Sequence, residues 1–329
     1  MSRAVASNAL LLAGILGCGS EGAAAPPGKP TYIRLSQTGL YSDWAERSLA
    51  PGVRGFEPTY KLWSDGADKA RWIALPEGAT IDTSDMNRWA FPVGTRLWKE
   101  FSIGGKRLET RLIERYGDEP SDYWMGSFVW EGDDGDALLS EGGADNLLGT
   151  DHDAPARERC PACHNGEPGR VLGFSALQLA SAPVEPALAA LAAEGWLSSP
   201  PGDGASYALL GDTDGAAALG YLHANCGSCH NPRGTAWPDT QMLLRLDVDG
   251  RAAQTSFVFD SVVNQRLQYY RPEDGAITSR VVPGHPESSG LIARMQVRGP
   301  MEQMPPLATE RVDDAGVDLV SRWITSLPE

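Results

Sequence analysis

The pattern C-x-x-C-H occurs twice in this chain of 329 residues, at positions 160–164 and 226–230. In this pattern two thiols on adjoining turns reach the two vinyl groups of one porphyrin and form thioethers. The histidine after the second thiol then lies under the iron as its proximal ligand. The sequence therefore predicts two covalently attached c-type haems, bound through Cys160, Cys163, Cys226 and Cys229.

Two other chemistries use the same thiols. A single C-x-x-C pair can be a redox dithiol, and four cysteines in two pairs can form a zinc site. Three features favour haem. Each pair is followed directly by a histidine, the pairs lie farther apart than in a zinc knuckle, and the chain begins with a predicted export signal.

That signal occupies residues 1–18. The apolar run 9–17 is too short to span a bilayer and is typical of a secretory signal. Residues 15–18 resemble a bacterial lipobox, which predicts a lipid anchor at Cys18, and the absence of Asp in the next two positions favours the outer membrane. Ordinary cleavage after residues 23–25 is the alternative and would discard Cys18. Residues 19–30 are expected to be a flexible tether.

The charge of the chain limits its partners. The formal net charge is −15 and the pI is near 4.8, which argues against a nucleic-acid partner. An acidic surface is compatible with steering a basic redox protein, whose identity the sequence does not give, and equally with simple solubility in the periplasm.

Residues 31–175 are expected to form a β-rich domain of six or more strands that carries the first haem motif. Short apolar alternations are separated by turn residues, and Gly104-Gly105 predicts a hairpin. The segments 111–116 and 124–130 are expected to pair as antiparallel neighbours. The predicted core of this domain consists of tryptophans, and the wall of a haem site is the alternative place for such a side chain. These are Trp63, Trp72, Trp89, Trp98, Trp124 and Trp130.

Residues 176–205 are expected to be a helical connector and linker. Apolar residues recur there at helical spacing, and Pro183 and Pro186 place the helix start late. The Pro/Gly-rich stretch 200–204 is the predicted boundary between domains.

Residues 206–329 are expected to form a mostly α, class I cytochrome c-like domain. A helix over 214–225 leads into the second motif, and an amphipathic helix over 312–326 ends the chain. A strand-like insertion is expected at 242–246 and 256–259. The predicted fold class is thus α+β and multidomain, with a β-rich and a mostly helical domain that each carry one haem motif.

For the second haem, His230 is the predicted proximal ligand and Met304 the distal one. Pro305-Pro306 follows Met304 and stiffens the loop that must hold a weak thioether against iron. The alternatives are Met301 or His285 as the ligand, and a Met304 that only packs.

For the first haem, His164 is the predicted proximal ligand, but the sixth position stays open. Met125, His152 and His223 are candidates, and an iron without a sixth ligand is a further possibility. This position separates a pure electron carrier from an enzyme.

Several stretches resemble a family of bacterial dihaem c-type cytochrome lipoproteins of unassigned activity. The stretches that carry this resemblance are 60–69, 91–95, 171–174 and 221–226. Residues 221–231, 284–286 and 304–306 resemble the class I cytochrome c domains of exported bacterial proteins. The resemblance implies haem binding and electron transfer, and little more.

A weaker likeness concerns the N-terminal half. Phe91-Pro92-Val93-Gly94 leading to Lys99, followed by a late C-x-x-C-H, resembles the cytochrome P460 and c′-β group. In some members of that group a lysine crosslinks to the haem and the distal side accepts small nitrogen species. Lys99 is the nearest match here, although a surface lysine on a strand is the simpler interpretation.

The expected function is therefore electron transfer through two covalently bound haems in the cell envelope, with no catalytic residue assigned. The alternative is a haem enzyme, peroxidase-like or oxidising a small nitrogen species, with an open first iron. A haem-bearing sensor without turnover is a third hypothesis.

Overall fold

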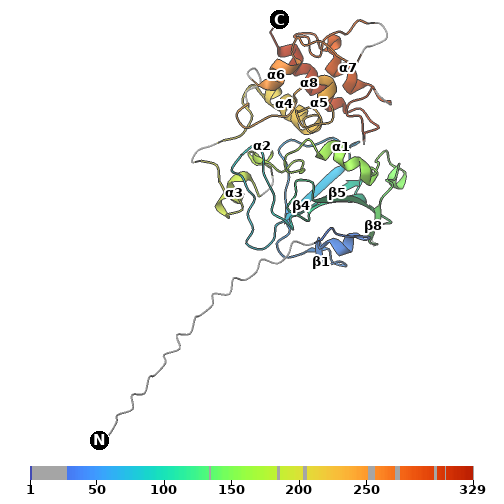
Figure 1. Ribbon diagram of the computed structural model, residues 1–329. Helices are drawn as coiled ribbons and strands as arrows, with labels where there is room; N and C mark the ends of the chain where they lie inside the picture. Colours follow the sequence, from blue (N-terminus) through green and yellow to red (C-terminus); the bar gives the residue numbers. More distant parts are fainter. Residues whose placement is uncertain are drawn as a thin grey trace.

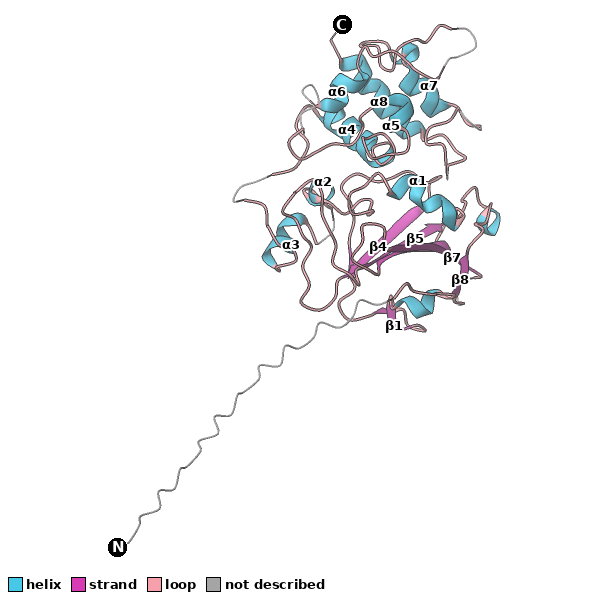
Figure 2. Ribbon diagram, in the orientation of Figure 1, coloured by secondary structure: helices cyan, strands magenta, loops and turns pink. Residues whose placement is uncertain are grey.

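The computed structural model describes residue 1 and residues 28–132, 135–183, 186–202, 206–250, 256–270, 275–299, 302–307 and 309–328. The lipobox, Cys18 and most of the tether lie outside these residues, as do Met301 and part of the predicted linker. We call 28–202 the N-terminal half and 206–328 the C-terminal half. The described chain is mixed α and β, with the sheet in the first half and most of the α-helices in the second (Figures 1 and 2).

The sheet contains six antiparallel strands in sequential order. They are β3 (Arg54–Gly55), β4 (Asp68–Ala74), β5 (Arg96–Ile103), β6 (Lys106–Arg115), β7 (Tyr123–Trp130) and β8 (Ala137–Ser140). The β5–β6 hairpin turns on Gly104-Gly105, both with positive φ, as predicted. The predicted pairing of 111–116 with 124–130 is also confirmed, by β6 and β7. A small separate ribbon joins β1 (Tyr41–Asp43) to β2 (Ser48–Leu49).

The two faces of the sheet differ in character. On one face Trp98, Trp124 and Trp130 are almost fully buried and form a core with η1 (Leu35–Thr38). The opposite face carries Arg71, Lys99 and Arg111 beside the apolar Leu97 and borders a cavity. Trp63 is only half-buried and lines that cavity, which agrees with the alternative place for a tryptophan and not with the core. Trp72 is also half-buried and packs against the core.

The N-terminal half also contains several short helices. They are η2 (Leu147–Gly149), η3 (Arg157–Arg159), α1 (Cys160–His164), α2 (Ala176–Leu179) and α3 (Leu188–Ala193). A second core holds Trp89, Phe91 and Phe174 together with Leu188 and Leu191 of α3. The two prolines at 183 and 186 predict that the connector helix starts late, and α3 does begin at Leu188.

The C-terminal half is built on two crossed helices, α4 (Thr213–Asn225) and α8 (Asp314–Ser326), at the two predicted places. A Cβ on Gly316 would lie 2.4 Å from the ring of Tyr221, so the glycine lets α4 and α8 approach closely. Around them lie α5 (Trp237–Thr240), α6 (Phe257–Val262), η4 (Pro286–Ser288) and α7 (Gly290–Gln296). Among the described residues, no helix has the length and apolar character needed to cross a bilayer.

The strand-like insertion predicted for this half is wrong. Residues 242–246 form no strand, and the segment predicted as a strand at 256–259 opens helix α6. Ser256 caps this helix by accepting a hydrogen bond from the Phe259 amide (3.2 Å), and Val258 and Val262 bury one helical face. A short apolar run alone does not distinguish a strand from a buried helix.

Candidate haem-binding cavity

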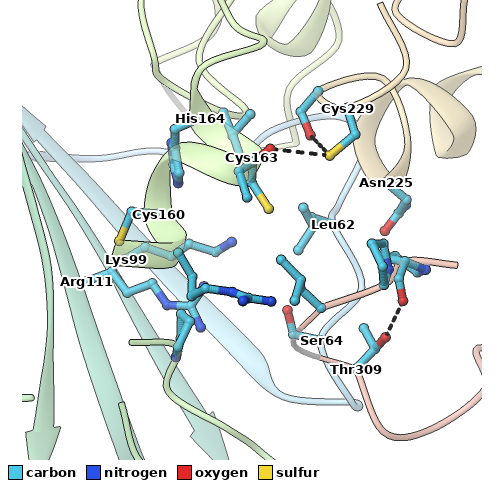
Figure 3. Close-up of a pocket in the computed structure, with 18 of the residues that line it drawn as sticks. Leu62, Ser64, Lys99, Arg111, Cys160, Cys163, His164, Asn225, Cys229 and Thr309 are labelled. Atoms are coloured by element: carbon cyan, nitrogen blue, oxygen red, sulfur yellow. Dashed lines mark hydrogen bonds between the residues drawn. The ribbon is translucent and has the colours of Figure 1, made fainter. Parts of the chain in front are cut away.

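Both C-x-x-C-H motifs line one cavity of about 710 Å³ between the two halves. The first motif forms helix α1, and the second follows the end of α4 (Figure 3). Apolar residues from both halves complete the walls, including Leu62, Leu244 and Leu291. Such a volume suits an organic cofactor and is far larger than a bare metal ion needs.

The loops of the two motifs touch. A Cβ on Gly166, two residues after the first motif, would lie 1.8 Å from the Ser228 carbonyl oxygen inside the second. The Cys229 thiol donates to the Ala162 carbonyl oxygen (3.6 Å) and also interacts with the thiol of Cys163. One thiol from each motif therefore faces the other across the boundary between the halves (Figure 3).

The thiols of the two motifs differ in pKa. Burial raises the pKa of the Cys160 thiol, and burial with the neighbouring Cys229 raises that of Cys226 to about 12. The hydrogen bond with Cys163 lowers the pKa of Cys229 to about 6, so the lowered thiol is paired with the other motif and not with the second cysteine of its own C-x-x-C. Among the described residues, no three His, Cys, Asp or Glu side chains converge as metal ligands.

The predicted proximal histidine His164 is held with one nitrogen free. Its Nδ1 lies 2.7 Å from the carbonyl oxygen of Arg170, and a carbonyl oxygen can only accept, so Nδ1 carries the proton. Nε2 therefore keeps its lone pair. Burial, with Lys99 and Arg111 nearby, lowers the pKa of His164 to about 4, which keeps the ring neutral as a metal ligand requires.

The predicted proximal histidine His230 is arranged in the same way. Its Nδ1 lies 3.3 Å from Oγ1 of Thr240, whose proton is already donated to the Ala236 carbonyl oxygen (2.8 Å). The hydroxyl oxygen must then accept from Nδ1–H, which leaves the lone pair on Nε2. Burial, with the charges of two arginines, lowers the pKa of His230 to about 4.

His223 and His152 are held differently. The backbone amide of Leu246 donates to Nδ1 of His223 (3.1 Å), so the proton of that neutral ring is on Nε2 and neither nitrogen has a free lone pair. His152 uses Nε2 to bind the buried carboxylate of Glu109 (2.9 Å). Neither ring lines the cavity. Of the three candidates for the sixth ligand of the first haem iron, only Met125 lines it.

Met304 lines the same cavity as His230, and its backbone amide is fixed by the Arg294 carbonyl oxygen (2.9 Å) of α7. The alternative His285 is exposed, interacts with Glu287 and does not line the cavity. Met242 and Met295 also line it. Neither methionine is predicted from the sequence, because neither lies in a loop with a recognisable signature.

The stretch 60–65 joins the halves beside the cavity. Asn225, directly before Cys226, accepts from the Trp63 amide (2.6 Å) and donates to the Lys61 carbonyl oxygen (3.3 Å). Buried Asp65 accepts from the amides of Glu310 and Arg311 (2.9 and 2.8 Å). These contacts give a structural role to a stretch that, in the sequence, carries only a family resemblance.

No protein-family model, curated protein or solved structure matches this chain. A function for the chain must therefore be inferred from the residues that line the cavity.

Proposed function

We propose that the protein is an exported dihaem c-type cytochrome that transfers electrons through two covalently bound haems. The observation that carries the proposal is the shared state of His164 and His230. Both line the cavity beside their C-x-x-C pair, and both have Nδ1–H bonded and Nε2 free. The residues present thus fit the group that the motifs imply.

In this proposal each residue has a defined part. Cys160 and Cys163 hold one porphyrin, and Cys226 and Cys229 hold the other. His164 and His230 supply the proximal nitrogens, and Met304 the distal sulfur at the second site. Bound haem supplies one-electron chemistry, while the protein sets its orientation and burial and the axial ligands that tune its potential.

The contact between Cys163 and Cys229 supports transfer inside the chain. Haems bonded to these two sulfur atoms are attached at neighbouring points of a single cavity. One electron then has a short internal route between the halves, and it needs an external donor at one haem and an external acceptor at the other. In the same proposal a lipid at Cys18 anchors the chain at the outer membrane, facing the periplasm.

A specific observation favours the second candidate, a haem enzyme that is peroxidase-like or oxidises a small nitrogen species. His152 and His223 are occupied elsewhere, and Lys99 and Arg111 line the cavity below the first motif (Figure 3). Unless Met125 binds it, the first iron is then open to a small molecule on its distal side.

The test is expression in a host that attaches c-type haem, followed by intact mass, metal analysis and spectroscopy. The expected mass exceeds that of the chain by two haems, and replacing both cysteines of one motif by Ser removes one. A colourless product with tightly bound zinc contradicts the proposal. Two low-spin signals support the carrier, whereas a high-spin component that responds to peroxide or hydroxylamine supports the enzyme.

A further inference from the structure

Three cations stand side by side on the cavity face of the sheet. Arg71 of β4 is the direct cross-strand partner of Lys99 on β5, and Lys99 is the partner of Arg111 on β6. Direct partners in an antiparallel sheet have Cβ atoms about 5 Å apart and project from the same face. We call these three residues the cationic row.

The cationic row has too few carboxylates around it. Among the described residues, Arg71 and Lys99 form no ion pair, although Arg71 is only 6% exposed. Arg111 is paired with Glu109, but that carboxylate is shared with His152. Like charges directly opposite one another destabilise a sheet, and a buried charge is costly unless it is paired.

The cationic row also faces a defined part of the cavity. All three side chains line it, and Figure 3 shows Lys99 and Arg111 beneath the helix that bears Cys160 and His164. The positive charge is thus directed at the space beside the first motif and away from bulk solvent.

We propose that the cationic row binds an anionic oxygen group, a carboxylate or small oxyanion, in the cavity below the first motif. Two planar guanidinium forks and one ammonium suit the several oxygens of such a group. The proposal rests on the proposed function for its haem but adds a ligand site. The anion has two possible sources: the propionates of the first haem, or a free oxyanion from solution.

The experiment uses the haem-loaded protein and the variants Arg71→Gln, Lys99→Gln and Arg111→Gln. Lys106→Gln is the matched control, because Lys106 is exposed at the hairpin of the same sheet. Each protein is titrated with sodium nitrite while the haem spectrum is recorded, and the potentials of both haems are measured. Arg71→Gln and Lys99→Gln relieve repulsion between like charges, so these two variants are expected to fold and load haem. Arg111→Gln also loses the ion pair with Glu109, so its result counts only where its haem content equals that of wild type.

If the site takes a free oxyanion, nitrite perturbs the wild-type spectrum and each row variant binds it about tenfold or more weakly, as expected for losing one charge-assisted hydrogen bond. If the propionates occupy it, nitrite has no effect, and the row variants shift the potential of the first haem but not the second. Lys106→Gln matches wild type in both cases.

Row variants that equal Lys106→Gln in nitrite affinity and in both potentials would overturn the inference. Such a result leaves the proposed function intact, because haem content is measured separately on the same samples. A chain that never acquires haem contradicts the proposed function instead.

Discussion

Asn225 offers a quantitative test of how the two halves hold together. Its side chain accepts from the Trp63 amide at 2.6 Å and donates to the Lys61 carbonyl oxygen at 3.3 Å, and both bonds cross between the halves. A third bond, to the Tyr221 carbonyl oxygen (3.0 Å), stays within α4. Asn225→Ala therefore removes two bridging hydrogen bonds and leaves their partners unsatisfied.

The cost follows from the burial of the site. A net hydrogen bond contributes about 1 kcal/mol, and a buried group left without a partner costs about 1–3 kcal/mol. Because Trp63 is only half-buried, we take the lower end, about 2 kcal/mol for Asn225→Ala. This corresponds to a roughly 30-fold rise in the equilibrium constant for local opening of the stretch 60–65.

Hydrogen–deuterium exchange read by mass spectrometry measures that opening directly. Asn225→Asp keeps the acceptor for the Trp63 amide and loses the donor to Lys61, so its exchange should lie between wild type and Asn225→Ala. Asn231→Ala is the control, because its amide bonds stay within the second motif loop. Unchanged exchange of 60–65 in Asn225→Ala, or equal exchange in Asn225→Asp and Asn225→Ala, would refute the reasoning.

The other predictions concern single sites. Met304→Ala should abolish the methionine-to-iron charge-transfer band and lower one potential, and a surviving band shows that another side chain is the ligand. Gly166→Ala must displace the Ser228 carbonyl oxygen, so exchange at both motif loops should rise; unchanged exchange contradicts the close contact. Burial opposes the charge of Glu109, yet Arg111 and His152 hold its pKa below 4.5. Its stabilising contribution is thus present above pH 4.5 and lost as the pH falls through the lowered value. Glu109→Gln should therefore cost most stability to urea near pH 7 and progressively less as the pH falls below 4.5; a cost independent of pH contradicts this. Cys18→Ser should release the protein from membranes, and continued membrane association argues against the lipid anchor.

Local sequence signals are enough to predict some elements of this structure. The Gly104-Gly105 hairpin and helices α4 and α8 follow from turn chemistry and a helical period, which neighbouring residues specify. The apolar run 256–259 predicts a strand, but Ser256 also carries a helix-capping signal, and the cap prevails in the structure.

The site depends more on tertiary structure. The motifs identify two thiol pairs and two histidines, but only the fold shows that Cys163 meets Cys229 and that Leu246 occupies Nδ1 of His223. The cationic row is a product of strand register, which brings Arg71 and Arg111 to either side of Lys99 from positions far apart in the chain.

The inward placement of the four thiols has a consequence for biogenesis. In the proposed cytochrome, the attachment machinery must reach each thiol pair before Gly166 closes against Ser228 and the halves seal the cavity between them. Docking would then come last in maturation, after both porphyrins are bound, and a chain that closed early would trap its cysteines next to one another with no cofactor.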